Sequence, residues 1–332
     1  MTARPLALSL GDPAGVGPEI VVKAWRALRG EGPAFFVVGD AASLSSAPLA
    51  DGVPIRRISA ASEAGDVFAD AIPVLDLPVG APVTPGQPSG AYAAAVIAWI
   101  ETGAALALSG QAAGLVTAPI AKAPLYASGF RFPGHTEFLG ELTHARAEDG
   151  PVMMLMAGDL RTTLVTIHEP LAAVAALVTR EKIVRTALIT ARALQRDFGV
   201  AQPRVAVAAL NPHGGETGAL GRQEIEVIAP ACEELRALGV DVSGPRPSDT
   251  LFHPEARAAY DAVVCMYHDQ ALIPVKLLDF WGGVNVTLGL PIVRTSPDHG
   301  VGWDIAGKGV ARPESLIAAI RTACEIAARR AA

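Results

Sequence analysis

The chain has 332 residues, of which 51% are hydrophobic and 18% are charged, so it can bury a sizeable core as one large or two ordinary domains. Its formal net charge of −6, with no basic run, argues against a nucleic-acid surface and fits an ordinary soluble protein. The 3 cysteines are widely spaced, which suggests neither a disulfide framework nor a cysteine-type zinc site.

The start of the chain does not resemble an export signal. Residues 1–5 lead into a short apolar run that Gly11-Asp12-Pro13 interrupts, and no apolar run reaches membrane-spanning length. We therefore expect a cytoplasmic enzyme that acts on neither a nucleic acid nor a membrane.

The first part of the chain alternates apolar strands with helices, which is typical of an α/β fold. Strands are predicted at 6–10, 34–38, 72–77 and 114–117, and helices directly after residue 17 and at 91–108. The glycine-rich loop 11–17 lacks the third glycine of the dinucleotide-binding fingerprint, so it is either a structural tight turn or a phosphate contact. Lys122 follows the fourth strand and faces either a ligand or solvent.

The composition changes near Gly129, and a second lobe is predicted from there. A loop at 130–138 leads into a helix that Thr136 is placed to cap. Further predicted elements are an antiparallel hairpin at 152–157 and 161–167, a long helix at 171–198, a strand at 205–210, a helix at 223–238, a loop at 245–252 and a strand at 262–265.

The last quarter of the chain again combines apolar strands, a glycine-rich loop and a helix, as the first part does. It contains predicted strands at 282–291 and 292–294, a glycine-rich loop at 299–309, and a terminal helix from Pro313. The α/β fold is therefore expected to have two lobes: an outer lobe of residues 1–129 plus 281–332, and an inner lobe of residues 130–280.

Three apolar strands each run into a histidine, at His168, His213 and His268. Ligands of open α/β sheets bind outside the carboxyl ends of the strands, so the shared context predicts a three-histidine metal site. The alternatives are separate roles for the histidines or ordinary hydrogen bonding. Three neutral imidazoles leave coordination positions open for substrate oxygens, which is typical of a catalytic site.

Carboxylates and cations lie near this pattern. Asp249 and Asp269 are placed to orient a ligand or to accept a proton. Lys276, Asn285 and Arg294 form a separate set that suggests an anionic substrate, because arginine binds phosphate or carboxylate oxygens bidentately. The alternative for Arg294 is a pair with an acidic residue.

Six short motifs follow one another in a fixed order between residues 6 and 325. They are Gly11-Asp12-Pro13-Ala14-Gly15-Val16-Gly17-Pro18-Glu19, Pro133-Gly134-His135-Thr136-Glu137, Leu210-Asn211-Pro212-His213, Asp249-Thr250-Leu251-Phe252, Met266-Tyr267-His268-Asp269-Gln270 and Asn285-Val286-Thr287-Leu288-Gly289-Leu290-Pro291. Together they resemble the motifs of the 4-hydroxythreonine-4-phosphate dehydrogenase family, which acts in pyridoxal phosphate biosynthesis.

The resemblance implies an isocitrate and isopropylmalate dehydrogenase type of fold, rather than a Rossmann fold, and a homodimer with shared active sites. It implies that His168, His213 and His268 bind one divalent metal ion, which by ligand chemistry is zinc, cobalt, magnesium or manganese. It also implies substrate contacts, which fall on His135, Thr136, Lys276, Asn285 and Arg294. We take Lys276, Asp249 and Asp269 as candidate catalytic residues.

The reaction implied by the resemblance is an oxidation by NAD or NADP. The C3 hydroxyl of 4-phosphooxy-L-threonine is oxidised, and the resulting β-keto acid loses CO2 to give 3-amino-2-oxopropyl phosphate.

The loop 299–309 carries a second resemblance, to the adenosine-binding loop of isopropylmalate dehydrogenases. It departs from that loop at Val301-Gly302-Trp303. The expected cofactor contacts are Gly300, Asp304, Ile305, Ala306 and Gly307. Because the carboxylate of Asp304 would repel a 2′-phosphate, we expect NAD to be preferred over NADP.

Three alternative functions remain open. The nearest is a related dehydrogenase of D-threonate or D-erythronate 4-phosphate. A metal hydrolase that activates water at a three-histidine site is a second, and a two-lobed binding protein is a third.

Overall fold

The computed structural model describes residues 4–132, 134–146 and 150–332. Pro133, the first residue of the second motif, lies outside the described residues. The chain divides into two compact units, Met1–His144 with Leu290–Ala331, and Ala145–Gly289 with Ala332.

The first unit is built on parallel strands in the order β3-β4-β2-β1-β5-β12. The strands are β1 (Leu6–Ser9), β2 (Phe35–Gly39), β3 (Ile55–Arg57), β4 (Ile72–Asp76), β5 (Leu115–Thr117) and β12 (Arg294–Pro297). The helices are α1 (Gly17–Leu28), α2 (Ala41–Ser45), α3 (Ala64–Val67), α4 (Ala93–Leu108), α5 (Lys122–Ala127), α6 (His135–Leu142) and α12 (Glu314–Ala331).

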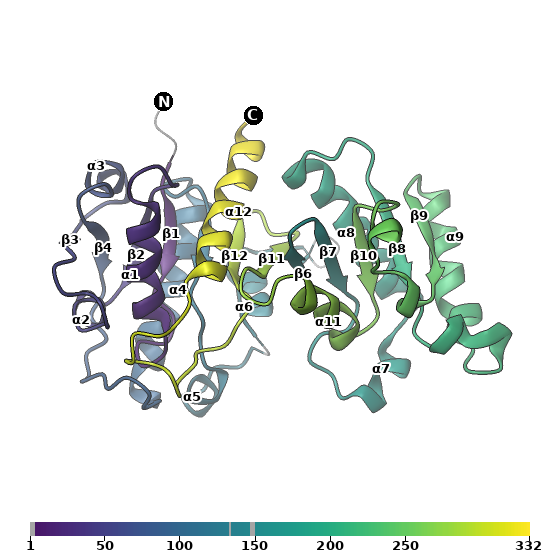
Figure 1. Cartoon of the computed structure of the whole chain (residues 1–332), viewed down its shortest axis with the longest axis horizontal. Coiled ribbons are helices and arrows are strands. Elements are labelled where there is room, and N and C mark those ends of the chain that lie inside the picture. The colour runs from purple at the N-terminus through teal and green to yellow at the C-terminus, as the bar shows by residue number, and fades with distance from the viewer. Residues whose placement is uncertain (1–3, 133, 147–149) are drawn as a thin grey trace. The chain divides into compact units, whose positions relative to one another are not determined.

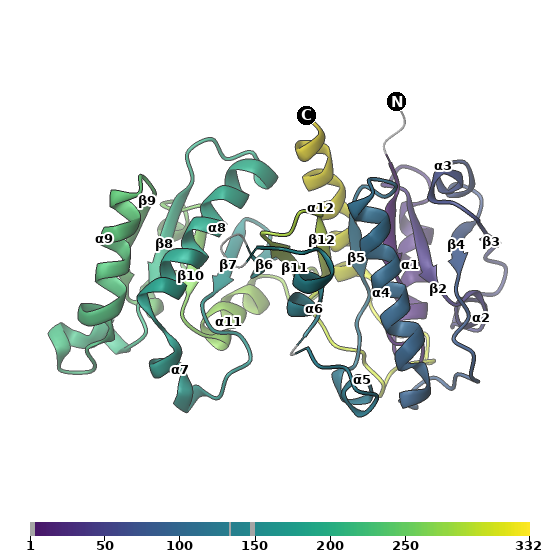
Figure 2. The same cartoon turned by 180° about the vertical axis from the view of Figure 1, so that it is seen from behind.

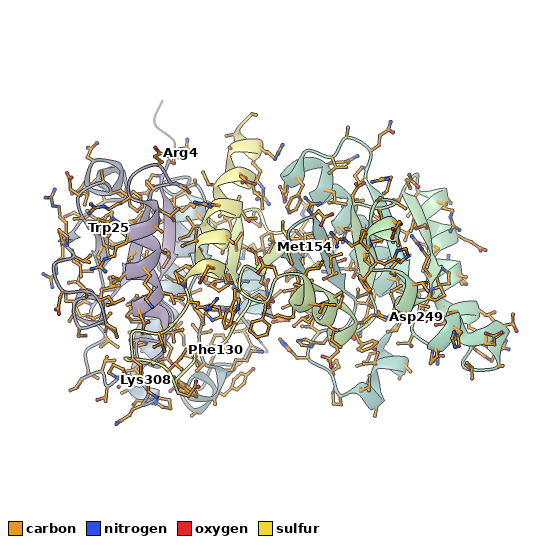
Figure 3. All side chains as sticks on the ribbon, in the orientation of Figure 1. Arg4, Trp25, Phe130, Met154, Asp249 and Lys308 are labelled. Carbon is orange, nitrogen blue, oxygen red and sulfur yellow. The ribbon has the colours of Figure 1, made fainter. Side chains whose placement is uncertain are left out.

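Helices cover both faces of these strands, as parallel sheets require. Helices α1 and α12 pack together on one face, and α4 crosses β1, β2 and β5 on the other (Figures 1 and 2). Every residue of β1 and β2 is therefore buried, which explains their uninterrupted apolar runs. Trp25, which Figure 3 labels, fixes α1 to the unit by donating its indole N–H to Phe68 O at 2.8 Å.

The second unit has the strand order β11-β6-β7-β10-β8-β9. Strand β6 pairs antiparallel with both β11 and β7, and the strands from β7 through β10 and β8 to β9 are parallel. The strands are β6 (Val152–Ala157), β7 (Leu160–Leu164), β8 (Arg204–Ala208), β9 (Asp241–Arg246), β10 (Ala262–Cys265) and β11 (Val284–Leu288). The helices are α7 (Leu171–Leu177), α8 (Arg180–Phe198), α9 (Ala229–Ala237), α10 (Pro254–Arg257) and α11 (His268–Leu278).

Alternate residues of the same strand serve two cores in this unit, because successive side chains of a strand point to opposite faces. Val205 and Val207 pack under α8 and α9, whereas Ala206 and Ala208 pack on the side of Ala271 and Val275 of α11. Helices α8 and α11 accordingly lie on opposite faces (Figures 1 and 2).

The boundaries between the units differ from the expected 129/130 and 280/281. They lie at 144/145 and 289/290. Helix α6 remains with the first unit, where its first residue, His135, contacts Arg294. Strand β11 stays with the second unit because it pairs with β6 along its whole length.

Five local predictions were wrong or incomplete. The expected helix 171–198 is two helices, because Thr179 is extended and its side chain accepts a hydrogen bond from Lys182 N at the start of α8. The residue before α6 is Gly134, so Thr136 is buried in the first turn and does not cap it. Strand β9 and helix α11 were not predicted, and β12 begins where the strand 292–294 was expected to end.

One described segment, Gly90–Leu108, is long and apolar enough to cross a membrane, by length and composition alone. The expectation that no segment would reach this length was therefore too strict. In the structure α4 packs against β1, β2 and β5, which accounts for its apolar composition within the fold.

Candidate functional site

Three histidines follow three neighbouring strands of the second unit. Strands β7, β10 and β8 are adjacent and parallel in that order. His168 follows β7, His213 lies in the turn after β8, and His268 begins α11 directly beyond β10. Because the carboxyl ends of parallel strands meet at one edge of a sheet, the fold delivers all three histidines to the same edge.

His168 and His268 lie side by side at this edge. Their ring centroids are 5.8 Å apart and the rings are tilted by 40°. A metal–nitrogen bond of about 2.0–2.1 Å puts the rings of two histidines on one tetrahedral ion roughly 5 to 6 Å apart. The spacing of this pair therefore fits two ligands of a single ion.

His213 is exposed and does not join the pair. Its backbone is left-handed, with φ 51°, and left-handed backbone continues through Thr217. Among the residues that the structure describes, no group of three or more His, Cys, Asp or Glu side chains is gathered to hold a metal ion. The structure thus brings two of the three predicted ligands together.

Glu224 anchors the segment that carries His213. Its carboxylate accepts hydrogen bonds from the backbone N–H groups of Leu210 and Asn211, at 2.8 and 2.7 Å, and from Asn211 Nδ2 at 2.9 Å. Burial raises the pKa of Glu224, but the hydrogen bonds from Asn211 and Leu210 outweigh it, so the pKa lies below its ordinary value. Glu224 therefore holds the end of β8 as a carboxylate.

Gln270 ties three loops of the histidine edge together. Its Oε1 accepts a hydrogen bond from Met266 N at 2.6 Å, and its Nε2 donates to Ala209 O and to Ser248 Oγ, both at 2.7 Å. The side chain thereby joins the end of β10, the end of β8 and the turn that carries Asp249. Its amide cannot titrate, so these links hold over a wide pH range.

The candidate catalytic residues of this unit are accessible. Asp269 Oδ1 lies 2.7 Å from His268 Nδ1, so it can fix the orientation of that ring. Asp249 is exposed (Figure 3) on the turn that Gln270 holds. Lys276, on α11, places its ammonium 5.3 Å from the centre of the Phe280 ring.

Arg294 is the centre of a buried cluster in the first unit. It is only 2% exposed, at the start of β12, and its Nη2 donates to Thr117 Oγ1 at 2.7 Å. The same nitrogen lies 3.4 Å from His135 Nδ1. The sheet makes this meeting possible because β12 and β5 are paired, with Arg294 opposite Leu115.

His135 is held neutral in this cluster. Burial lowers its pKa well below 6.5, and the positive charges of Arg294 and Lys122 lower it further. With Nδ1 facing a guanidinium donor, a neutral ring carries its proton on Nε2. The Nε2 atom is buried and has no hydrogen-bond partner among the described residues. The cluster therefore offers one more donor to a ligand.

Burial also acts on the arginine. It lowers the pKa of Arg294 to about 10, which leaves the guanidinium charged at neutral pH. Lys122 lies close to Gly134, where an added Cβ would come within 3.5 Å of its Nζ.

The other two predicted substrate residues are also sheltered. Thr136 is buried in the first turn of α6. Asn285 lies in β11 opposite Leu155, and its Oδ1 is buried without a hydrogen-bond partner among the described residues. A buried amide oxygen without a partner is costly, so Asn285 is suited to accept a hydrogen bond from a ligand.

The loop 299–309 is fixed to the glycine-rich loop 11–17 in the first unit. Val16 N donates to Val301 O at 2.9 Å, and Trp303 Nε1 donates to Asp12 Oδ2 at 3.2 Å. Gly15 is required here, because an added Cβ would lie 2.8 Å from Val301 O. The glycine-rich loop thus has a structural role in the position of its partner loop.

Glu19 and Lys23 of α1 hold the end of the same loop. The carboxylate of Glu19, which is 1% exposed, accepts hydrogen bonds from Gly309 N at 3.1 Å, Ala311 N at 2.7 Å and Lys23 Nζ at 2.7 Å. Lys23 Nζ donates in turn to Gly309 O at 3.0 Å and to Ala311 O at 2.5 Å.

Gly300 directly precedes the first of these anchors, and the other four candidate cofactor residues lie between them. Gly300, Asp304 and Gly307 are exposed, Ile305 is half-buried and Ala306 is buried. Gly307 has φ 78°, and a Cβ there would come within 2.7 Å of Pro85. The backbone is thus held while Asp304 remains accessible.

Comparison with known proteins decides the family. The model of the family described as pyridoxal phosphate biosynthetic protein PdxA matches residues 31–323. The chain belongs to the PdxA family. A relative from Caulobacter vibrioides, a 4-hydroxythreonine-4-phosphate dehydrogenase, is 68% identical over 99% of each chain.

Two solved structures extend the comparison. A 4-hydroxythreonine-4-phosphate dehydrogenase from Klebsiella pneumoniae is 38% identical, with a TM-score of 0.86 and 98% of each chain covered. A terephthalate 1,2-cis-dihydrodiol dehydrogenase from Burkholderia xenovorans is 32% identical, with a TM-score of 0.65, and covers 97% of this chain and 98% of its own. The predicted family, the non-Rossmann α/β fold and the prediction of a dehydrogenase are confirmed.

Sequence reasoning missed several residues that position the candidate site of this PdxA-family chain. Glu19 and Gln270 were quoted only as parts of motifs, and Glu224 was not singled out. A signal was present for Glu19, because an acidic residue that follows a glycine loop at the start of an apolar helix is a buried charge in need of a partner.

Proposed function

We propose that the chain oxidises 4-phosphooxy-L-threonine with NAD, or less efficiently NADP, and releases 3-amino-2-oxopropyl phosphate and CO2 in pyridoxal phosphate biosynthesis. The observation that carries this proposal is the 68% identity, over 99% of the chain, to a 4-hydroxythreonine-4-phosphate dehydrogenase. A dihydrodiol dehydrogenase is 32% identical to this chain, so likeness at that level alone does not fix the substrate.

The buried cluster around Arg294 supports a phosphorylated substrate. A charged guanidinium and a neutral imidazole with its proton on Nε2 both donate hydrogen bonds, and Lys122 adds positive charge. Phosphate oxygens accept such bonds strongly, particularly in a pair from arginine. We assign phosphate binding to Arg294, His135 and Lys122, and further substrate contacts to Thr136, Asn285 and Lys276.

The histidine edge of the second unit supports a divalent metal ion. The imidazole pair of His168 and His268 has a fitting spacing, and His213 comes from the neighbouring strand end. A bound zinc, cobalt, magnesium or manganese ion would supply a Lewis acid for negative charge on a substrate oxygen.

The residues around the histidines supply orientation and proton transfer. Asp269 holds the ring of His268 through its Nδ1, which leaves Nε2 as the ligand atom. Asp249, Asp269 and Lys276 are the candidates for the group that takes the proton of the substrate hydroxyl. Asp249 has the best support as an acceptor, because its carboxylate is accessible while Gln270 fixes its turn.

We assign the cofactor to the loop 299–309, with contacts from Gly300, Asp304, Ile305, Ala306 and Gly307. Asp304 is exposed at the position where a carboxylate favours ribose hydroxyls and repels a 2′-phosphate. This argument favours NAD.

An apolar face on α11 supports assembly as a homodimer. Ile273 and Leu277 are exposed one helical turn apart, with Leu277 at 85%, and the exposed Phe280 and Trp281 follow directly after the end of the helix. Exposed apolar side chains that cluster in this way are typical of protein interfaces. A second copy of the chain would cover this face, and we place the enzyme in the cytoplasm.

The test is an NADH-formation assay on the 4-phosphates of L-4-hydroxythreonine, D-threonate and D-erythronate, with and without a chelator. The proposal requires turnover of the threonine derivative that the chelator abolishes and added metal restores. A higher kcat/KM for one of the sugar acids would identify the related dehydrogenase instead. Full activity after thorough removal of metal would contradict the metal assignment.

A further inference from the structure

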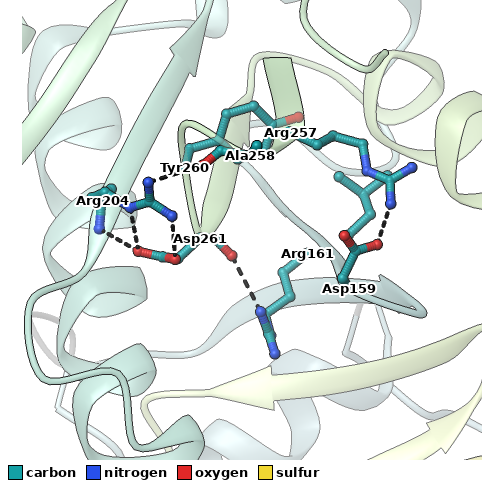
Figure 4. A pocket seen from close by; sticks show the side chains of 8 residues that line it. Asp159, Arg161, Arg204, Arg257, Ala258, Tyr260 and Asp261 are labelled. Carbon is teal, nitrogen blue, oxygen red and sulfur yellow. Dashed lines mark hydrogen bonds and ion pairs between the residues drawn. The ribbon is translucent and has the colours of Figure 1, made fainter. Parts of the chain in front are cut away.

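A charged pocket lies at the opposite ends of the strands that carry the histidines. It has a volume of about 240 Å³ and lies at the amino ends of β7, β8 and β10 (Figure 4). The residues around it are Asp159, Leu160, Arg161, Arg204, Arg257, Ala258, Tyr260 and Asp261. None of them belongs to the candidate site described above.

The lining carries three guanidinium groups but only two carboxylates. Arg204 pairs with Asp261, with Nη2 and Oδ1 3.0 Å apart, and Arg257 pairs with Asp159. Arg161 reaches Asp261 only through the backbone carbonyl, at 3.4 Å. The lining residues therefore carry one net positive charge.

Arg161 is the group whose charge the lining leaves unbalanced. Burial lowers its pKa, although Asp261 and Asp159 oppose this effect at a distance. Its guanidinium packs over the Phe198 ring at 4.9 Å, and its Nε has no hydrogen-bond partner among the described residues. A partly buried cation without a carboxylate in contact is costly, so an anion in the pocket would stabilise it.

Arg257 is placed to exchange its partner for a ligand. Its side chain is 17% exposed, whereas that of Asp159, in the turn between β6 and β7, is 73% exposed. The carboxylate therefore lies on the solvent side of the pair, and such a pair contributes little stability. Asp159 can turn outward and leave the guanidinium to an incoming oxyanion.

Tyr260 adds no negative charge to the pocket. Burial raises its pKa to about 12, and its hydroxyl donates to Leu251 O at 2.9 Å. The phenol is thus neutral and already engaged, which leaves the arginines as the donors that face a ligand.

We propose that this pocket binds a small phosphate, either inorganic phosphate or the phosphate group of a small ester, through Arg161 and Arg257. Two arginines can surround a tetrahedral oxyanion with paired, charge-assisted hydrogen bonds. The volume equals about eight water molecules at roughly 30 Å³ each, which is enough for a phosphate with a few further atoms.

The test is calorimetric titration of the full chain with inorganic phosphate and, separately, with glycerol 3-phosphate. The variants are Arg161→Met and Arg257→Met, and the matched control is Arg180→Met, which removes an exposed arginine of α8 that pairs with Glu234. Binding at one site per chain should weaken about tenfold or more in both pocket variants and stay unchanged in the control. Turnover with NAD should stay close to that of the unmodified chain in all three.

The two probes distinguish the source of the phosphate, since tighter binding of the ester indicates a metabolite and tighter binding of the ion indicates free phosphate. Arg294→Met separates this pocket from the buried cluster of the first unit and should leave the pocket intact. If Arg161→Met does not fold, Arg257→Met decides. Unchanged affinity and stoichiometry in a folded pocket variant, or no phosphate bound beyond what Arg294→Met removes, would overturn the proposal.

Discussion

Replacing Glu19 by Gln tests whether the contact between α1 and the loop 299–309 controls cofactor binding. The glutamine keeps the shape of the side chain but removes its charge. Its oxygen can still accept from Ala311 N and Lys23 Nζ, the two donors now on Oε1. Its amide group would then face Gly309 N–H, so two donors would oppose each other where a 3.1 Å hydrogen bond now lies.

The cost follows from these contacts. A buried donor that loses its partner costs about 1–3 kcal/mol, and the ammonium of Lys23 loses its counter-charge although it keeps two carbonyl acceptors. Breaking a buried pair outright costs about 3–5 kcal/mol, so we expect about 3 kcal/mol for this partial loss. If this free energy destabilises only the ordered conformation of the loop, the apparent affinity for NAD falls about a hundredfold.

Two measurements separate a loop effect from a global one. The KM for NAD should rise strongly in Glu19→Gln while the KM for the phosphorylated substrate changes little. If the change instead lowers the free energy of unfolding of the whole first unit, Tm should fall by about 6–12 °C. Glu314→Gln, an exposed glutamate at the start of α12, is the matched control and should change neither. A variant with unchanged Tm and unchanged KM for NAD would refute the reasoning.

Three further outcomes follow from the assigned roles. His268→Ala should keep the circular dichroism spectrum but lose bound metal and at least a hundredfold in kcat, whereas the exposed His253→Ala should lose neither; full activity without His268 would remove it from the site. Asp304→Ser should raise kcat/KM for NADP relative to NAD, and a clear NADP preference of the unmodified chain would show that the carboxylate does not discriminate. Leu277→Glu should halve the mass measured by light scattering, while Leu171→Glu, at an exposed leucine of α7, should not; a dimer that survives Leu277→Glu does not use this face.

Strand-end patterns predicted part of the candidate site. The apolar runs before His213 and His268 largely coincide with the strands β8 and β10, whereas β7 ends at Leu164, so most of the apolar run 164–167 before His168 lies beyond the strand. The pairing of β7, β10 and β8 then placed His168 and His268 together. His213 could not be placed in this way, because left-handed backbone at a histidine has no sequence signal.

Contacts between distant segments escaped sequence reasoning for a different reason. Arg294 and Thr117 meet because β12 pairs with β5, and nothing in either segment specifies its neighbour in the sheet. Helix α11 escaped because Pro274 lies within it and interrupts the expected helical pattern. The boundary at 289/290 depends on the pairing of β11 with β6, and the sequence of β11 likewise does not identify its partner strand.

The first unit is assembled from both ends of the chain, and this arrangement constrains its folding during synthesis. Strands β1 to β5 are made before the second unit, but β12, the partner of β5 on its other side, and the helix α12 are made after it. The second unit, in contrast, is a continuous segment whose strands are complete when Gly289 has been made.

The second unit can therefore fold first, while the incomplete first unit presents β5 as an unpaired edge until β12 has been made. Such an edge is a site for association with other chains. A ribosome that pauses after Gly289 would prolong the exposure of this edge.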